Sequence, residues 1–80
     1  MQFTVYVLKD DNGHFYKGMT KNLQKRLYDH KSKHTRTTAR MRNLSVAYTE
    51  VFDTFEAARK RELYFKSAAG RRFLKNKLGQ

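Results

Sequence analysis

A turn signal near the N-terminus constrains the fold of this chain most. Residues 10–13 read Asp-Asp-Asn-Gly and stand between two short runs rich in aromatic and β-branched residues. Asn and Gly tolerate the positive φ that tight hairpins require. The first run, residues 3–9, alternates between two faces, and the second extends from His14 to about Gly18. We expect these residues to form a β-hairpin.

The length of the hairpin loop decides which side chains share a face. In a three-residue loop with Gly13 in the left-handed conformation, Leu8 opposes Tyr16, and Tyr6 and Tyr16 become diagonal neighbours on one face. A two-residue loop would shift the register by one residue and place the two phenols on opposite faces. The expectation of a shared face therefore rests on the turn type.

A helix is predicted directly after the hairpin. Thr20 or Asn22 can cap it, it runs to about Lys33, and Leu23 and Leu27 are its apolar anchors. Arg26 and His30 lie on one flank of this helix, because residues four apart are neighbours on a helical surface.

The next segments predict a loop and a third strand. Residues 32–42 have no clear hydrophobic period and carry several basic side chains, so we expect a basic loop. Residues 44–52 alternate like a strand, with Leu44, Val46 and Tyr48 on one face.

Two more helices complete the predicted chain. Asp53, with Glu56 three residues later, resembles a capping box and predicts a helix to about Ser67. Gly70 is expected to break the chain before a short basic helix over residues 71–78. The order β-β-α-β-α-α predicts an α+β fold, with a small, mostly antiparallel three-stranded sheet flanked by helices, as one domain over residues 1–80.

Charge indicates the kind of partner. Eighteen Lys and Arg against seven Asp and Glu give a formal charge of +11, which attracts polyanions and favours nucleic acid over an anionic membrane. No apolar run is long enough to span a membrane, and there is no cysteine for a disulfide or a thiolate metal site. We expect a cytoplasmic protein, associated with the nucleoid when it binds DNA.

Glu62 is an anomaly on the second long helix. It falls within the apolar stripe of Phe55, Ala58 and Phe65, so its carboxylate faces inward. Burying a carboxylate is costly unless a cation or hydrogen bonds compensate. The cation is either Arg26 or a lysine in an ion pair, or a divalent metal completed by water and phosphate oxygens. Position alone leaves both alternatives open.

Two tripeptides and three single polar residues are spaced as in a known protein family. Residues 4–6 read Thr-Val-Tyr, residues 16–18 read Tyr-Lys-Gly, and Arg26, His30 and Glu62 follow. This pattern resembles the GIY-YIG nuclease superfamily, in its small stand-alone bacterial branch, over nearly the whole chain. Three positions depart from the family pattern, namely Thr4, Lys17 and Met19.

The resemblance implies a role for each site residue. Glu62 would be the ligand of one Mg²⁺ or Mn²⁺, and Arg26 would grip the scissile phosphate. Tyr6 would be the general base or would position the water, and Tyr16 would support it. A phenol is a poor base near neutral pH, so nearby positive charge is expected to lower the pKa of Tyr6. His30 is the rival base.

The residues and the resemblance together predict a metal-dependent DNA endonuclease that recognises structure rather than sequence, with DNA repair as one compatible role. The alternative is a catalytically inactive nucleic-acid-binding module with the same fold. RNA is not excluded as a substrate, and a protein partner or a homodimer could supply specificity. The candidate nucleic-acid contacts are Lys17, Gly18, Lys21, Lys25, Lys33, Arg36, Arg40, Arg42, Arg71 and Arg72. Gly18 is included because a glycine lets backbone approach closely.

The remaining tyrosines and histidines receive no role in the site. Tyr28, Tyr48 and Tyr64 are predicted to be packing residues, and His14 and His34 are predicted to lie at the surface.

Overall fold

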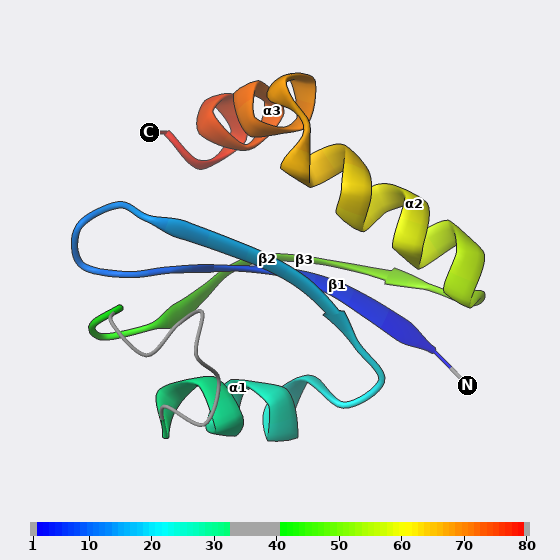
Figure 1. The fold of residues 1–80 in the computed structure, drawn as a ribbon, viewed down its shortest axis with the longest axis horizontal. Coiled ribbons are helices and arrows are strands. Elements are labelled where there is room, and N and C mark those ends of the chain that lie inside the picture. The colour runs from blue at the N-terminus through cyan, green and yellow to red at the C-terminus, as the bar shows by residue number, and fades with distance from the viewer. Residues whose placement is uncertain (1, 33–40, 80) are drawn as a thin grey trace.

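The computed structural model describes residues 2–32 and 41–79, which form a sheet between two layers of helices (Figure 1). The elements are β1 Phe3–Lys9, β2 Phe15–Thr20, α1 Leu23–Lys31, β3 Ser45–Phe52, α2 Phe55–Lys66 and α3 Ala68–Leu78. The sheet order is β2-β1-β3, and both strand pairs are antiparallel. Helix α1 covers one face, and α2 and α3 cover the other (Figure 1). The predicted α+β class and element order are confirmed.

The hairpin between β1 and β2 has the three-residue loop that places the two phenols on one face. Gly13 adopts φ 83°, and its N–H donates to the Asp10 carbonyl at 3.3 Å. Leu8 pairs with Tyr16 as expected. The Asp10 carboxylate stabilises the turn further, because its Oδ1 accepts from the His14 N–H at 2.8 Å. Strand β2 is longer than predicted and continues to residue 20.

Side chains of the central strand β1 point alternately into two apolar clusters. Val5 and Val7 pack towards α2 and α3, in a cluster with Ala58, Phe65 and Leu74. On the α1 side, the buried cluster consists of Tyr6, Leu8 and Leu44, with Leu23 and Leu27 packed against it. The predicted apolar anchors of α1 are therefore confirmed. Because Tyr6 is part of this core, its phenol is held rigidly.

Helix α1 begins as one of the two predicted caps requires. The Asn22 side chain accepts from the Lys25 N–H at 3.1 Å, and the Thr20 hydroxyl accepts from the Asn22 N–H at 3.1 Å. The helix ends at Lys31. The predicted end near Lys33 and most of the predicted basic loop lie outside the described residues.

The predicted single face for Val46 and Tyr48 is wrong. Val7 pairs with Tyr48, but its neighbour Leu8 pairs with Val46, so Ala47 is the extra residue of a β-bulge. The bulge turns Tyr48 towards α2 and α3 and leaves Val46 on the α1 side, 39% exposed. The strand itself begins at residue 45 rather than 44.

The predicted capping box at Asp53 is also wrong. The N-cap of α2 is Thr54, whose side chain accepts from the Ala57 N–H at 3.2 Å. Ala57 cannot return a side-chain hydrogen bond, so the cap is a single interaction rather than a reciprocal pair.

Gly70 does not break the chain, contrary to prediction. It is buried inside α3, where a Cβ would lie 1.8 Å from the Tyr64 carbonyl oxygen. The break is at Ser67, which ends α2 and caps α3 through a hydrogen bond from the Gly70 N–H at 3.1 Å. Gly70 is therefore required for the close approach of the two helices.

Arg61 ties the helical layer to β3. Its guanidinium donates to the Glu50 carboxylate at 2.8 and 3.2 Å, and the Tyr48 hydroxyl donates to the same carboxylate at 2.5 Å. The Arg61 guanidinium also lies over the rings of Tyr64, Phe65 and Phe73. This network holds α2 and α3 in place against the sheet.

Two of the three tyrosines assigned to packing are confirmed. Tyr48 and Tyr64 pack against the cluster under α2 and α3. Tyr28 is 64% exposed, so its assignment to packing is wrong. His14 is exposed as predicted, whereas His34 lies outside the described residues.

Candidate active site

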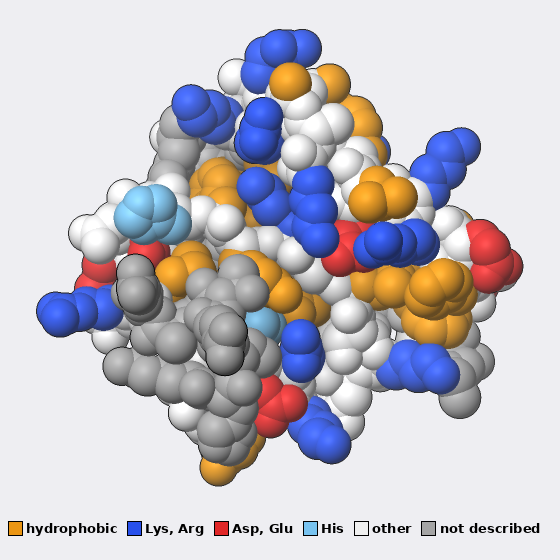
Figure 2. All heavy atoms as spheres, viewed as in Figure 1, with side chains coloured by type: hydrophobic (Ala, Val, Ile, Leu, Met, Phe, Trp, Pro, Cys, Tyr) orange, Lys and Arg blue, Asp and Glu red, His pale blue; other side chains and the backbone are white. Residues whose placement is uncertain are grey.

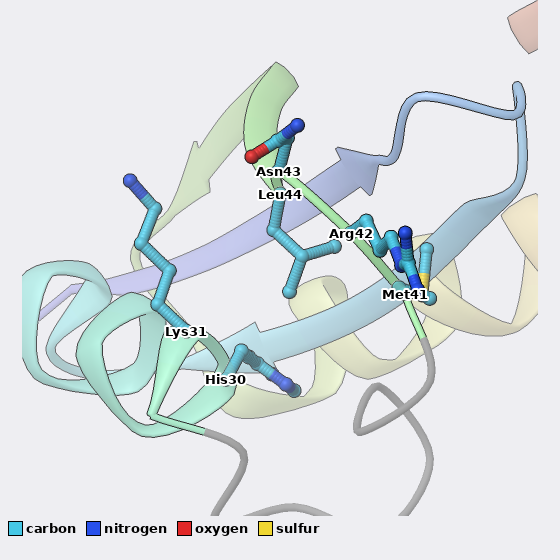
Figure 3. A pocket seen from close by; sticks show the side chains of 6 residues that line it. All are labelled: His30, Lys31, Met41, Arg42, Asn43 and Leu44. Carbon is cyan, nitrogen blue, oxygen red and sulfur yellow. The ribbon is translucent and has the colours of Figure 1, made fainter.

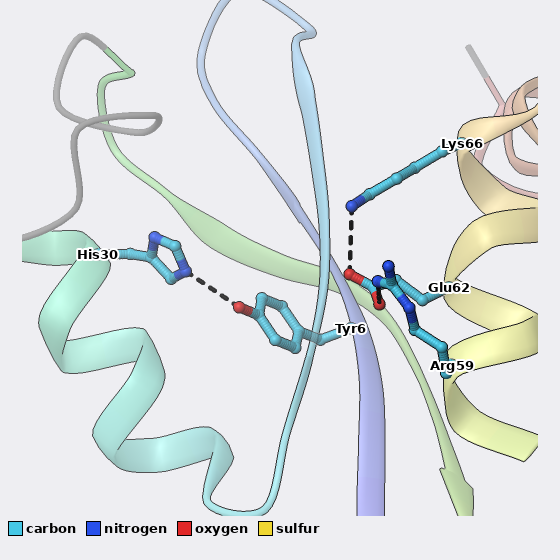
Figure 4. Close-up of polar contacts among 5 residues, drawn as sticks. All are labelled: Tyr6, His30, Arg59, Glu62 and Lys66. Atoms are coloured by element: carbon cyan, nitrogen blue, oxygen red, sulfur yellow. Dashed lines mark hydrogen bonds and ion pairs between the residues drawn. The ribbon is translucent and has the colours of Figure 1, made fainter. Parts of the chain in front are cut away.

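The centre of the candidate site is a buried hydrogen bond between Tyr6 of β1 and His30 of α1 (Figure 4). The phenol oxygen lies 3.0 Å from Nε2 of the imidazole, and the two residues are 1% and 0% exposed. The two side chains point towards each other because the hairpin register turns Tyr6 to the α1 face.

Tyr16 and Arg26 surround this pair, as the sequence predicts. The Tyr16 ring centroid lies 6.2 Å from that of Tyr6 and 4.8 Å from that of His30. Arg26 is half-buried, and its interaction with the Tyr6 phenol, followed by that with Tyr16, raises the pKa of its guanidinium. One arginine therefore serves both phenols.

Burial, not charge, sets the proton affinity of the two central groups. Burial raises the pKa of Tyr6, and the opposing interaction with Arg26 does not compensate. Arg26 lowers this pKa, as expected, but burial raises it by more, so the net shift is upward. A lowering by a bound metal stays a prediction. Burial, followed by the positive charge of Arg26, lowers the pKa of His30. Both groups are consequently neutral near pH 7.

Gly18 makes room for the Tyr6 phenol. The two residues are directly opposed across β1 and β2, and a Cβ on Gly18 would lie 2.5 Å from the phenol oxygen. Gly18 is buried, so the close approach that it permits is to Tyr6. This packing role differs from the backbone contact with nucleic acid that the sequence suggested, which stays a prediction.

Glu62 faces inward as predicted and is 7% exposed. Its Oε1 accepts from Arg59 at 2.9 Å and its Oε2 from Lys66 at 3.2 Å (Figure 4). Of the predicted ion-pair partners, the lysine is confirmed, and Arg26 lies instead against the phenols. Sequence reasoning missed Arg59 and did not say which lysine pairs with Glu62, although spacings of three and four residues on one helix are the signal that identifies both partners.

The two halves of the site come from opposite helical layers. Figure 4 shows Tyr6 and His30 on the α1 side and Glu62 projecting from α2. The Glu62 carboxylate is nevertheless among the charges that raise the pKa of Tyr6. The edge strand β2 lies between the halves (Figure 4).

Lys and Arg side chains are spread over the face of the molecule that Figure 2 shows, and the predicted nucleic-acid contacts among them differ in exposure. Lys17 is half-buried and Gly18 is buried, whereas the other predicted contacts within the described ranges are exposed, namely Lys21, Lys25, Arg42, Arg71 and Arg72. The remaining three predicted contacts lie outside the described residues, namely Lys33, Arg36 and Arg40.

A cavity of about 800 Å³ opens between the end of α1 and the start of β3 (Figure 3). The described residues that line it are His30, Lys31, Met41, Arg42, Asn43 and Leu44. The imidazole of the central pair therefore adjoins a space with two basic side chains on its rim.

Comparison with known proteins identifies the family. The profile of the GIY-YIG catalytic domain matches residues 2–77. The chain belongs to the GIY-YIG family. This family's catalytic domain is of the nuclease type, and its substrate is nucleic acid.

Two relatives support the assignment. A UPF0213 protein of Staphylococcus saprophyticus is 32% identical over 72 residues, which cover 89% of this chain and 88% of the relative. The solution NMR structure of a UPF0213 protein of Bacillus halodurans has a TM-score of 0.59 and 26% identity, and the match covers 95% of this chain and 84% of that one. The GIY-YIG chain described here therefore shares its fold with a solved member of the UPF0213 proteins.

Few of the described side chains near Glu62 could serve as metal ligands. Within residues 2–32 and 41–79, no three side chains of His, Cys, Asp or Glu gather to form a metal site. Glu62 offers one hard oxygen donor at the site, and Mg²⁺ is often bound by one or two carboxylates together with water and substrate phosphates. The residues therefore fit a one-ligand site that is completed by the substrate.

Proposed function

We propose that this GIY-YIG protein is a metal-dependent endonuclease that hydrolyses phosphodiester bonds in DNA. The observation that supports it best is the buried Tyr6–His30 hydrogen bond, with Arg26 against the phenols and the inward Glu62 across β2. A structural core has no need of three interacting ionisable side chains, because each one that is buried lowers stability.

Arg26 would bind the scissile phosphate. Its planar guanidinium can donate two parallel hydrogen bonds to phosphate oxygens, which stabilises the charge that develops in the transition state. Tyr6 and Tyr16 already orient this guanidinium, so little reorganisation is needed when the substrate binds.

The protonation states favour a proton relay from water through Tyr6 to His30. The water oxygen forms a bond to phosphorus while the bond to the leaving oxygen breaks. The leaving oxygen takes a proton from solvent water, which yields a phosphate monoester and a hydroxyl, and His30 later returns its proton to solvent. The water proton passes to the Tyr6 oxygen, and the phenol proton passes to Nε2 of neutral His30. Tyr6 then acts without being ionised beforehand, which its raised pKa would prevent.

Glu62 would hold a divalent cation, Mg²⁺ or Mn²⁺. When bound, such an ion stabilises negative charge on the phosphate and on the departing oxygen. Arg59 and Lys66 pair with the carboxylate when no cation is present, which compensates its burial in the free protein.

The proposed recognition depends on DNA structure rather than sequence. The candidate contacts are Lys and Arg side chains, which suit phosphates and carry no sequence information by themselves. A formal charge of +11 supports backbone binding of this kind.

The decisive experiment is a cleavage assay on branched, single-stranded and duplex DNA, with and without Mg²⁺ or Mn²⁺. Wild type should cut at least one substrate only with metal. Glu62→Gln should lower the cleavage rate by about 100-fold or more without weakening DNA binding, because the metal contact that it removes stabilises the transition state. Lys60→Gln, on the same helix, is the control and should cut normally.

A second function is favoured by one observation. Both carboxylate oxygens of Glu62 already have cationic partners on α2, so the burial of Glu62 is explained without a metal. Tight DNA binding by wild type without cleavage of any substrate would establish an inactive binding module instead.

A further inference from the structure

A cluster of positive charge lies beside the edge strand β2, on the face of the sheet that carries α2 and α3 (Figure 2). Lys17 of β2 pairs with Val7 of β1, and Val7 packs into the cluster under α2 and α3. Paired residues point to the same face of a sheet, so Lys17 points towards these helices.

Lys66 and Arg71 approach Lys17 from the helical layer. Lys66 is the last residue of α2, and Arg71 lies near the start of α3, just beyond the break at Ser67. Burial lowers the pKa of the Lys17 ammonium, and the positive charges of Arg71 and Lys66 lower it further. Two further cations therefore lie within electrostatic reach of Lys17, and a bound anion would relieve their repulsion of its ammonium.

Lys66 also belongs to the catalytic half of the site. Its Nζ lies 3.2 Å from Oε2 of Glu62, and its side chain extends from α2 towards β2 (Figure 4). Arg59 holds the other oxygen of Glu62 at 2.9 Å, so the carboxylate keeps one cationic partner if Lys66 moves. Lys66 is half-exposed, and its flexible stem allows such a movement.

We infer that Lys17, Lys66 and Arg71 form a binding site for a second backbone phosphate of the nucleic acid, and that Lys66 leaves Glu62 to bind it. This inference rests on the proposed function and adds the path of the substrate. On this path, the sugar-phosphate backbone of the nucleic acid crosses β2 from Arg26 on the α1 side to Arg71 on the α3 side. Arrival of the substrate also frees one oxygen of Glu62.

The test measures DNA affinity without metal, by fluorescence anisotropy of a labelled duplex in EDTA. Lys17→Gln, Lys66→Gln and Arg71→Gln should each weaken binding about 3- to 10-fold, and each should reduce the slope of log affinity against log salt by about 1. Lys60→Gln is the matched control, because it removes the same charge from an exposed position on α2 outside the cluster. It should change neither quantity.

A double-mutant cycle tests whether Lys66 is shared. Glu62→Gln should release Lys66 and strengthen metal-free DNA binding, and this gain should disappear in a Lys66→Gln background. If the gain persists there, Glu62 acts by general repulsion of DNA, and the sharing of Lys66 is refuted. Lys66→Arg should bind DNA like wild type, because it retains the charge.

Failure of this inference can be told apart from failure of the proposed function. If wild type binds DNA but the three cluster variants bind equally well, the second phosphate site is wrong, whatever the cleavage assay shows. If wild type neither binds nor cuts DNA, the proposed function fails and the inference falls with it.

Discussion

At the scale of single residues, Tyr6 and His30 are both held neutral near pH 7, and the physical reason is the same. Burial disfavours the charged form of each, which raises the pKa of the phenol and lowers that of the imidazole. Two neutral groups of this kind suit the proposed relay, in which the phenol passes its proton to the imidazole.

The lowered pKa of His30 predicts a specific pH dependence of stability. The unfolded chain protonates this imidazole near pH 6.5, but the folded protein resists protonation until a lower pH. The contribution is therefore fully present above about pH 6.5 and is lost as the pH falls towards the folded pKa. Between about pH 7.5 and 5.5, the free energy of unfolding of wild type should fall more steeply than that of His30→Asn.

Urea unfolding across this pH range measures the difference. Equal slopes for wild type and His30→Asn would show that the imidazole is not desolvated in the folded state.

Gly18 gives a second prediction at this scale. Gly18→Ala should displace the Tyr6 phenol, because the new Cβ would lie 2.5 Å from its oxygen. We expect about 1–3 kcal/mol of destabilisation from this overpacking, together with loss of activity. In a Tyr6→Ala background the same substitution should cost much less, since its clash partner is gone.

Thermal or urea unfolding of the four proteins of this cycle supplies the coupling energy. A cost of Gly18→Ala that is the same in both backgrounds would mean that backbone conformation, and not the phenol, requires glycine at this position.

At the scale of elements, the sequence predicted whatever depends on local pattern. The bounds of β1, the turn type set by Gly13 and the Asn22 cap all follow from residues close together in the chain. The contacts within the site could also be expected once the register was known, because the shared face of Tyr6 and Tyr16 follows from the turn.

The predictions that failed depend on contacts between elements. No local signal places a bulge at Ala47, because the bulge depends on how β3 pairs with β1. Asp53 and Thr54 are both good N-cap residues, and the structure uses the second. The requirement for glycine at position 70 likewise comes from the packing of α3 against α2, because the Tyr64 carbonyl oxygen leaves no room for a Cβ there.

For Gly70→Ala, the sign of the change in unfolding free energy distinguishes helix propensity from the packing of α3 against α2. Helix propensity alone would make Gly70→Ala stabilising by about 1 kcal/mol. The Cβ contact of 1.8 Å with a backbone oxygen predicts the opposite, a loss of about 3 kcal/mol or more. Urea unfolding measures the effect, and Ala69→Gly, in the same turn and exposed, should cost only the propensity term.

A stabilised Gly70→Ala variant would contradict the close approach of α2 and α3. It would also bear on the site, because Lys66 and Arg71 lie on either side of this junction and are brought together by it.

At the scale of the whole molecule, the sheet separates two kinds of surroundings. The α1 side holds the Tyr6–His30 pair, and the α2 side holds Glu62 and the cluster of Lys17, Lys66 and Arg71. Within the described parts of the chain, no helix is long or apolar enough to cross a membrane. The positive charges on the two sides of the sheet suit the proposed path of a nucleic acid across β2.

Salt should act on folding and on DNA binding in opposite directions. With 18 basic and seven acidic side chains, self-repulsion destabilises the compact state, and ions screen it. Raising NaCl from about 0.05 M to about 0.5 M should therefore raise the melting temperature, even though it weakens partly exposed ion pairs such as Arg61–Glu50. The same change should lower DNA affinity steeply, because counterions released on binding are then more concentrated. Circular dichroism and anisotropy on one salt series measure both effects. A melting temperature that falls with salt would mean that attraction within ion pairs exceeds the repulsion among the positive charges. The excess of positive charge would then not destabilise the folded protein.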